Sequence, residues 1–303
     1  MIPRSVRLFI QLSRPLFLVG AALLFGLGVG IARYLGASVN WTIYFLGQSW
    51  VSSLQLSAHY LNEYYDSPVD SQNPNRTPFS GGSNAVGPGK LSRNVPLVAA
   101  LTSLTITASL TVVMLQASLI TPVVLMIMMV SLLGALFYSV PPVRLSTTGY
   151  GELTTSILVA NLVPTFGYLL QMHDLHRLLV MSTFPLTVLH LAMMLAFEFP
   201  DYATDVKYEK QTLLVRLGWQ NGMVVHNVLI LSAFLLLGLA MLFGLPSGIA
   251  VPAFLPLPLG LLQIWQMRRI AAGAKPNWNM VTLTAVVLFA STAYLLTFTF
   301  WTR

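Results

Sequence analysis

Charged residues are scarce in this sequence. Asp, Glu, Lys and Arg make up 8% of its 303 residues, whereas hydrophobic residues make up 55%. A soluble globular domain carries about 25% charged residues. The composition therefore excludes an ordinary soluble protein and indicates an integral membrane protein.

Cysteine is absent, which excludes disulfide bonds and thiolate chemistry and leaves the redox compartment open. A separate cleavable signal is not expected either. Arg4, Arg7 and Arg14 precede an apolar run that continues to Ile31, which is too long for the hydrophobic part of a signal peptide. We expect this run to form the first membrane-spanning helix.

Long apolar runs recur through the whole chain. About 20 apolar residues are needed to cross a bilayer, and nine segments approach or exceed this length. They lie near residues 15–33, 42–64, 95–115, 118–138, 151–171, 178–199, 222–243, 249–267 and 279–300. The sequence therefore predicts an all-α membrane protein, with nine transmembrane helices packed in one bundle and a single domain over residues 1–303.

Basic residues are divided unequally between the two sides of the predicted membrane. One side takes thirteen of the sixteen, and only Arg33, Arg177 and Arg303 fall on the other. Cytoplasmic loops are enriched in Lys and Arg, so we expect a cytoplasmic amino terminus, in a prokaryotic plasma membrane. The net charge of +7 then follows membrane topology, and no nucleic-acid partner is expected.

Acidic residues are concentrated on this same side, where seven of the nine fall in two short windows. In the first window, Asn62, Asp66 and Asp70 are four residues apart and so project from one face of a helix. Pro68 is expected to loosen the last turn, which would leave Asp70 on an irregular helix end.

Asp201 and Asp205 form a second column with the same spacing. Carboxylates in a column repel one another unless a cation lies between them, and Mg²⁺ prefers such hard oxygen ligands. We expect both columns to converge on one site for Mg²⁺ and a diphosphate. The alternative is a structural ion-pair network, in which basic loop residues neutralise the carboxylates.

Two long polar loops, residues 66–94 and 200–221, are expected to form a cytoplasmic cap over the site, with the Gly81–Gly82 pair giving it flexibility. Cationic side chains stabilise a leaving diphosphate. The candidates for binding its oxygens are Arg76, Lys90, Arg144, Lys207 and Lys210.

The two columns together resemble the acidic motifs of the UbiA superfamily of intramembrane prenyltransferases. The resemblance covers nearly the whole chain, including the helix count. It implies that the Mg²⁺-diphosphate of a polyprenyl donor is bound by Asn62, Asp66, Asp70, Asp201 and Asp205.

Shorter segments match the same family. Arg14-Pro15 opens the first helix as in the family, which implies a role for Arg14 in the substrate site. The segment Tyr138-Ser139-Val140-Pro141-Pro142 resembles the family's sequence after the fourth helix. There the resemblance implies that Tyr138 lies near the diphosphate and the allylic carbon.

Two segments resemble the MenA-like branch more closely: Gly149-Tyr150-Gly151-Glu152 and Thr212-Leu213-x-Val215-Arg216-Leu217-Gly218. That branch transfers a polyprenyl group to an aromatic acceptor, 1,4-dihydroxy-2-naphthoate, in menaquinone biosynthesis. The family's other acceptors remain open: 4-hydroxybenzoate, homogentisate, a chlorin, haem or a glycerol phosphate lipid. A cation-coupled transporter is the alternative outside the class.

The sequence also departs from the family pattern. Glu63 stands where the first motif usually has Asp, and Ser146 lies near a position that often carries Lys, so the cation there is expected to be Arg144. Glu209 replaces a common Gly before Lys210. Residues 75–83 differ from the best-known MenA enzymes, which weakens the acceptor assignment but not the metal site.

Overall fold

The computed structural model describes residues 3–303. This part of the chain is helical, with an isolated bridge between Val86 and Leu91 and no β-strand. In order, the helices are α1 (Arg4–Leu12), α2 (Pro15–Tyr34), α3 (Trp41–Asp70), α4 (Asn94–Gln116), α5 (Pro122–Ser139), the short 3₁₀ turn η1 (Leu145–Thr147), α6 (Gly151–Ile157), the π-helical turn η2 (Leu158–Leu162), α7 (Val163–Leu169), α8 (Arg177–Glu198), α9 (Tyr202–Lys207), α10 (Leu213–Leu217), α11 (Trp219–Leu242), α12 (Ser247–Ala253), α13 (Leu257–Ala271) and α14 (Trp278–Thr302).

Each of the nine predicted segments is helical. Within residues 3–303, seven stretches are long and apolar enough to cross a membrane: α2, α4, α5, α8, α11, residues 247–271 (α12 with α13) and α14. The other two predicted segments do not meet this measure. Gln48, Gln55 and several serines already dilute the apolar character of α3 before its acidic window, and the π-helical turn η2 divides residues 151–169 into shorter helices.

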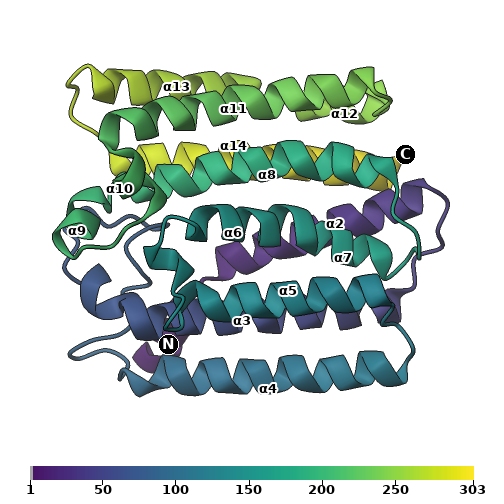
Figure 1. Cartoon of the computed structure of the whole chain (residues 1–303), viewed down its shortest axis with the longest axis horizontal. Helices are drawn as coiled ribbons and strands as arrows, with labels where there is room; N and C mark the ends of the chain where they lie inside the picture. Colours follow the sequence, from purple (N-terminus) through teal and green to yellow (C-terminus); the bar gives the residue numbers. More distant parts are fainter. Residues whose placement is uncertain (1–2) are drawn as a thin grey trace.

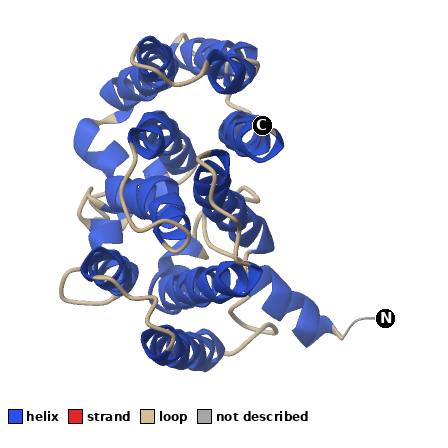
Figure 2. Ribbon diagram, turned by 90° about the vertical axis from the view of Figure 1, so that its right-hand side faces the viewer, coloured by secondary structure: helices blue, strands red, loops and turns tan. Residues whose placement is uncertain are grey.

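The long helices lie side by side along one direction (Figure 1). Viewed along that direction they form a bundle, from which α1 projects at the edge (Figure 2). The short helices α9 and α10 and the loop of residues 71–93 gather at one end of the bundle, opposite the carboxyl terminus (Figure 1). These segments carry many of the chain's acidic and basic residues, which are thus collected at that end.

Helices α2 and α7 approach each other unusually closely. A Cβ at Gly28 would lie 1.8 Å from the carbonyl oxygen of Pro164, and one at Gly167 would lie 2.7 Å from that of Phe25. Small residues let helix backbones pack together where the apolar solvent gives no hydrophobic driving force. The contact fixes two helices that also line the cavity described below.

The outer surface of the bundle is apolar, as the membrane prediction requires. Large apolar side chains such as Leu101 on α4 and Met126 on α5 are more than half exposed. Tryptophans lie at both ends of the long helices: Trp41 stacks on Trp301 at one end, and Trp219 meets Trp278 at the other. Aromatic rings at two levels are typical of the two membrane–water interfaces.

Candidate active site

The first acidic column lies on one face of α3. Asn62 donates from Nδ2 to Oδ2 of Asp66 at 2.8 Å, across one helical turn. The helix runs on through Pro68 and ends at Asp70, so the predicted loosening of the last turn is wrong. Proline removes one backbone hydrogen bond, but the neighbouring turns keep their helical geometry, and all three polar side chains keep the spacing of four.

The second column begins in the turn after α8. The backbone N–H of Asp205 donates to the carbonyl of Asp201 at 2.9 Å, so the two residues are one helical turn apart. The Asp201 carboxylate accepts hydrogen bonds from Nδ2 of Asn73 at 2.6 Å and from the backbone N–H of Gly81 at 3.1 Å. Both donors belong to the loop that follows α3, which ties the second column to the first.

The glycine pair in this loop contacts both columns. Gly82 follows Gly81, and a Cβ at Gly82 would lie 2.6 Å from Oδ2 of Asp70. Both glycines have positive φ angles, 76° and 74°, which side chains disfavour. Farther back in the loop, the ring of Phe79 stacks on Phe197 of α8, with centroids 6.0 Å apart. The loop therefore covers the site and needs glycine where it touches the carboxylates.

Three of the predicted cations reach the first column. Arg144 places Nη2 2.9 Å from Oδ1 of Asp66, and Lys210 places Nζ 3.6 Å from its Oδ2. Arg14 contacts Oδ1 of Asn62 at 3.5 Å. Arg144 and Lys210, from separate parts of the chain, meet at the Asp66 carboxylate, which is only 3% exposed, while Arg14 reaches Asn62 one helical turn away.

The other three predicted cations are placed elsewhere. Arg76 and Lys90 both donate to Oδ1 of Asn84 within the loop, and Lys207 is exposed and lies over the ring of Tyr208. Their spacing in the sequence put them near the acids, but none of them lines the cavity described next.

Glu63 has its own hydrogen-bond partners. Its Oε2 accepts from Arg14 at 3.1 Å and from the backbone N–H of Ser83 at 2.9 Å. The longer carboxylate at this motif position therefore fastens the loop to α3 and the start of α2.

One cavity of about 340 Å³ joins the two acidic columns, Arg14 and Lys210 to the interior of the bundle. Its polar end is lined by Arg14, Asn62, Asp66, Asp70, Tyr138, Asp201, Asp205 and Lys210. From there it continues between α2, α3, α5, α7 and α8, where apolar side chains such as Leu24, Leu54, Phe166 and Met193 line it. The arrangement suits a molecule with an anionic head and a long apolar tail.

Six buried polar residues in the cavity wall are absent from the predicted site. They are Ser80, Ser146, Glu152, His190, Glu198 and Thr212. Two of them could have been found from the sequence, because Glu152 and Glu198 lie at the ends of apolar runs. An acid placed there is costly to bury and points to function.

Burial and mutual repulsion make the carboxyl groups of the second column hard to ionise. Burial, reinforced by the carboxylates of Asp205 and Asp70, raises the pKa of Asp201 to about 8. Burial raises the pKa of Asp205 to about 6. Burial alone would lower the pKa of Lys210, but the surrounding carboxylates raise it above its usual value. The site therefore favours bound cations.

The donor set fits Mg²⁺. All five predicted ligands line the same cavity and offer carboxylate or amide oxygens. Among residues 3–303, no three Asp, Glu or His side chains are already grouped as a metal cage. Mg²⁺ commonly uses one or two carboxylates together with water and substrate phosphates, so a preformed cage is not required.

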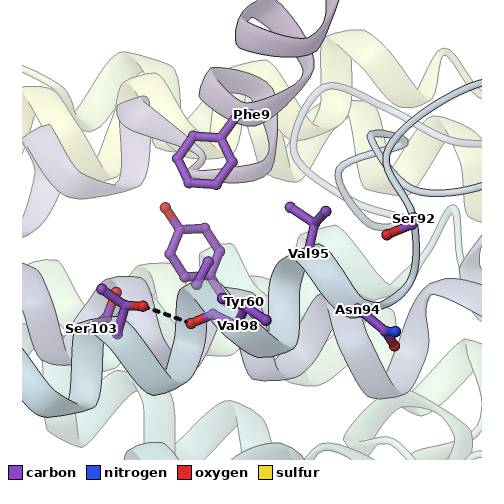
Figure 3. Close-up of a pocket in the computed structure, with 9 residues that line it drawn as sticks. Phe9, Tyr60, Ser92, Asn94, Val95, Val98 and Ser103 are labelled. Carbon is purple, nitrogen blue, oxygen red and sulfur yellow. Dashed lines mark hydrogen bonds between the residues drawn. The ribbon is translucent and has the colours of Figure 1, made fainter.

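A second hollow, of about 450 Å³, lies between α1 and the start of α4. Figure 3 shows the ring of Phe9 above Tyr60, with Val95 and Val98 beside them and Ser92, Asn94 and Ser103 around the margin. None of its nine lining residues is acidic or basic. It lacks the acids and cations that line the cavity inside the bundle, which is therefore the candidate site.

The chain is similar to a known protein family and to solved structures that share its fold. The model of the UbiA prenyltransferase family matches residues 22–291. No curated protein is similar enough in sequence to count as a relative.

Solved structures share the fold at low sequence identity. A digeranylgeranylglyceryl phosphate synthase superposes with a TM-score of 0.66 at 15% identity, over 99% of this chain and 100% of that one. A UbiA homologue from Archaeoglobus fulgidus, bound to GPP and Mg²⁺, gives 0.65 at 16% identity, over 95% of this chain and 99% of that one. A UbiA homologue from Aeropyrum pernix K1, in its apo form, gives 0.62 at 14% identity, over 93% and 96%.

Proposed function

Because the chain belongs to the UbiA prenyltransferase family, we propose that it transfers a polyprenyl group from a Mg²⁺-bound polyprenyl diphosphate to 1,4-dihydroxy-2-naphthoate. Members of that family transfer isoprenoid groups, so the chain is an enzyme. The observation that carries the proposal is the single cavity, with acids and cations at one end and apolar side chains along the rest.

The donor is proposed to lie along this cavity. Asn62, Asp66, Asp70, Asp201 and Asp205 would hold Mg²⁺, as the presence of GPP and Mg²⁺ in the Archaeoglobus fulgidus structure supports. When bound, Mg²⁺ would neutralise charge on the departing diphosphate. The polyprenyl tail would follow the apolar lining between α2, α3 and α7.

The chain's own residues then perform the rest of the chemistry. Lys210, Arg144 and Arg14 bind the diphosphate oxygens and stabilise the charge that grows on them as the allylic C–O bond breaks. Tyr138 lies beside the polar end and stabilises the allylic cation through its ring. The apolar walls keep water out, so the ring carbon that carries the carboxylate attacks the allylic cation and forms the new C–C bond. The bond from that carbon to the carboxylate then breaks, and CO₂ leaves as the ring regains its aromaticity.

The proposed acceptor rests on two segments of the chain that contact each other. A Cβ at Gly149 would meet the Arg216 side chain at 2.5 Å, and the Arg216 guanidinium lies over the ring of Tyr150, 5.5 Å from its centroid. These are the two segments that resemble the MenA-like branch, and each contributes a cavity residue, Glu152 and Thr212. The contact supports a shared role for both segments in binding a naphthoate.

We also propose the topology that follows from the distribution of charge. In this proposal α3 and residues 151–169 cross the membrane as well, which gives nine spans. The end of the bundle that carries α9, α10 and the loop of residues 71–93 faces the cytoplasm as a cap, in a prokaryotic plasma membrane. Arg33, which lies over Trp301, and Arg177, which lies near Gly244, would then be at the outer interface.

The test uses purified protein, geranylgeranyl diphosphate, Mg²⁺ and dihydroxynaphthoate, with mass spectrometry of the product. Asp66→Asn and Asp201→Asn are expected to lower turnover at least about 100-fold. The exposed Asp174→Asn is the matched control. Turnover that survives both substitutions would refute the proposed metal-diphosphate site, and a different prenylated product would refute the naphthoate acceptor.

A further inference from the structure

Two buried glutamates face the cavity outside the acidic columns. Glu152, near the start of α6, is 5% exposed, and Glu198, the last residue of α8, is 8% exposed. Both line the same cavity as the metal-binding candidates. Carboxyl groups at such depth are costly unless they have partners or a function.

Their partners do not account for them. The two carboxyl groups lie close together, and Oε2 of Glu198 accepts a hydrogen bond from the backbone N–H of Leu214 at 2.7 Å. Oε2 of Glu152 and Oε1 of Glu198 have no hydrogen-bond partner within the described chain. The ion pairs found among residues 3–303 involve Glu63 and Asp66 instead.

Two hydroxyl groups beside them are also without partners. Ser146 in η1 is 4% exposed and Thr212, just before α10, is 3% exposed. Both side chains line the cavity, and neither hydroxyl oxygen has a hydrogen-bond partner in residues 3–303. Buried polar groups are nearly always hydrogen-bonded. Carboxyl oxygens and hydroxyl groups that all lack hydrogen-bond partners in the same cavity wall therefore indicate a polar ligand.

We propose that Glu152, Glu198, Ser146 and Thr212 form the subsite for the hydroxyl groups of the acceptor. The inference rests on the proposed function, because it assumes that a donor occupies the acidic columns of the same cavity. An acceptor hydroxyl donates its hydrogen bond to the open carboxyl oxygens, and the Ser146 and Thr212 hydroxyls donate to the acceptor oxygens. The acids repel a carboxylate or a phosphate, so the acceptor enters this wall by an uncharged hydroxyl.

The position of the subsite agrees with this role. Glu152 lies near enough to Asp205 of the second column for the two carboxylates to repel each other. Tyr138 lines the cavity in the same region. A ring held by its hydroxyl here lies next to the polar end of the cavity, where the donor's reactive carbon is expected.

The test compares a hydroxylated acceptor with its methyl ether. The wild-type protein is first offered geranylgeranyl diphosphate, Mg²⁺ and a panel of 1,4-dihydroxy-2-naphthoate, 4-hydroxybenzoate and homogentisate. The acceptor that turns over fastest is then compared with its O-methyl ether, which is measured as a competitive inhibitor. Wild-type protein is expected to favour the hydroxyl form at least about 10-fold, since an ether leaves the buried carboxyl oxygens unpaired.

In Glu152→Gln and Glu198→Gln this preference is expected to fall to within about 3-fold, as the acceptor KM rises about 10-fold or more. The donor KM and binding of geranylgeranyl diphosphate with Mg²⁺ stay at wild-type values, which also shows that the variants are folded. Ser146→Ala and Thr212→Val should raise the acceptor KM by a smaller factor. The exposed Glu209→Gln is the matched control and keeps both constants.

The other outcomes separate the two proposals. An unchanged hydroxyl preference in both glutamine variants overturns the subsite, and so does a loss of donor binding equal to the loss of acceptor binding. Wild-type protein that binds the Mg²⁺-diphosphate but prenylates none of the hydroxylated acceptors overturns the subsite and leaves donor binding intact. Wild-type protein that does not bind the Mg²⁺-diphosphate overturns the proposed function itself.

Discussion

Lys210 connects the two acidic columns. Its ammonium lies 3.6 Å from Oδ2 of Asp66 on α3, while its backbone N–H donates to the carbonyl of Asp205 at 2.8 Å. The side chain therefore crosses from the second column to the first, in a cavity where burial disfavours unpaired charge. A cation in this position can release Asp66 to a metal and move onto a diphosphate oxygen without leaving the site.

Replacing Lys210 by Gln is expected to raise the donor KM and lower kcat, together reducing kcat/KM at least about 100-fold, because the variant loses a cation that binds the leaving diphosphate. Steady-state kinetics with geranylgeranyl diphosphate measures this. Lys207→Gln is the control, since Lys207 is exposed and lies over Tyr208. An equal loss of kcat/KM in the two variants would contradict the assignment of diphosphate binding to Lys210 rather than Lys207.

Gly82 is expected to tolerate no side chain. Alanine there meets Asp70 Oδ2 at 2.6 Å in addition to the strain of a φ angle of 74°, so it should displace the carboxylate and lower donor affinity about 10-fold or more. Gly89 offers a matched control, with a φ of 69° and no atom within 4 Å of an added Cβ. Gly89→Ala carries the same backbone cost of roughly 1–2 kcal/mol. Similar donor affinities in the two variants would exclude a role for the Gly82 contact.

Affinity for Mg²⁺ should rise with pH. The pKa of Asp201 is raised to about 8 and that of Asp205 to about 6, in each case first by burial. Below these values a proton competes with the metal, so affinity is expected to increase from pH 6 to pH 8 and to level off above that. Titration of Mg²⁺ followed by tryptophan fluorescence measures it. A constant affinity over this range would mean that these carboxyl groups are already ionised or are not ligands.

Without metal, the same raised pKa values act on stability in the opposite direction. The folded protein holds protons that the unfolded chain has already released, so stability falls as pH rises from about 4 towards 8. Thermal unfolding in detergent with a chelator should show the fall, and added Mg²⁺ should remove it by occupying the ionised site. Asp201→Asn is expected to flatten the metal-free profile.

The helical architecture and the two columns could be predicted because both depend on local pattern. Apolar run length places the helices, and a spacing of four places Asn62, Asp66 and Asp70 on one face whatever the tertiary structure does. The prediction that these three residues share one helix face also holds beyond Pro68, because the helix continues there although proline removes a backbone donor.

The partners of those columns depend on distant segments and could not be predicted in the same way. Arg76 and Lys207 lie close in sequence to the acids, as Lys210 does, yet they have other partners, and Lys90 also pairs within its own loop. Contacts such as that of Gly81 with Asp201, 120 residues apart, carry no signature in one sequence. The unpaired oxygens of Glu152 and Glu198 become visible only when the cavity wall is assembled.

The contact between α2 and α7 makes the last prediction. An alanine methyl group at Gly28 would lie 1.8 Å from the backbone oxygen of Pro164, and backbone cannot rotate away as a side chain can. The helices must separate, which should cost about 1–3 kcal/mol or more and lower the melting temperature in detergent. Gly238→Ala on α11, which meets only Phe254 at 3.8 Å, is the matched helical control and should be neutral or slightly stabilising, because alanine is the better helix former.

Since α2 and α7 also line the apolar part of the cavity, the separated helices should bind short and long prenyl diphosphates with a changed preference. An unaltered melting temperature in Gly28→Ala would mean that α2 and α7 are not in backbone contact in the membrane-extracted protein.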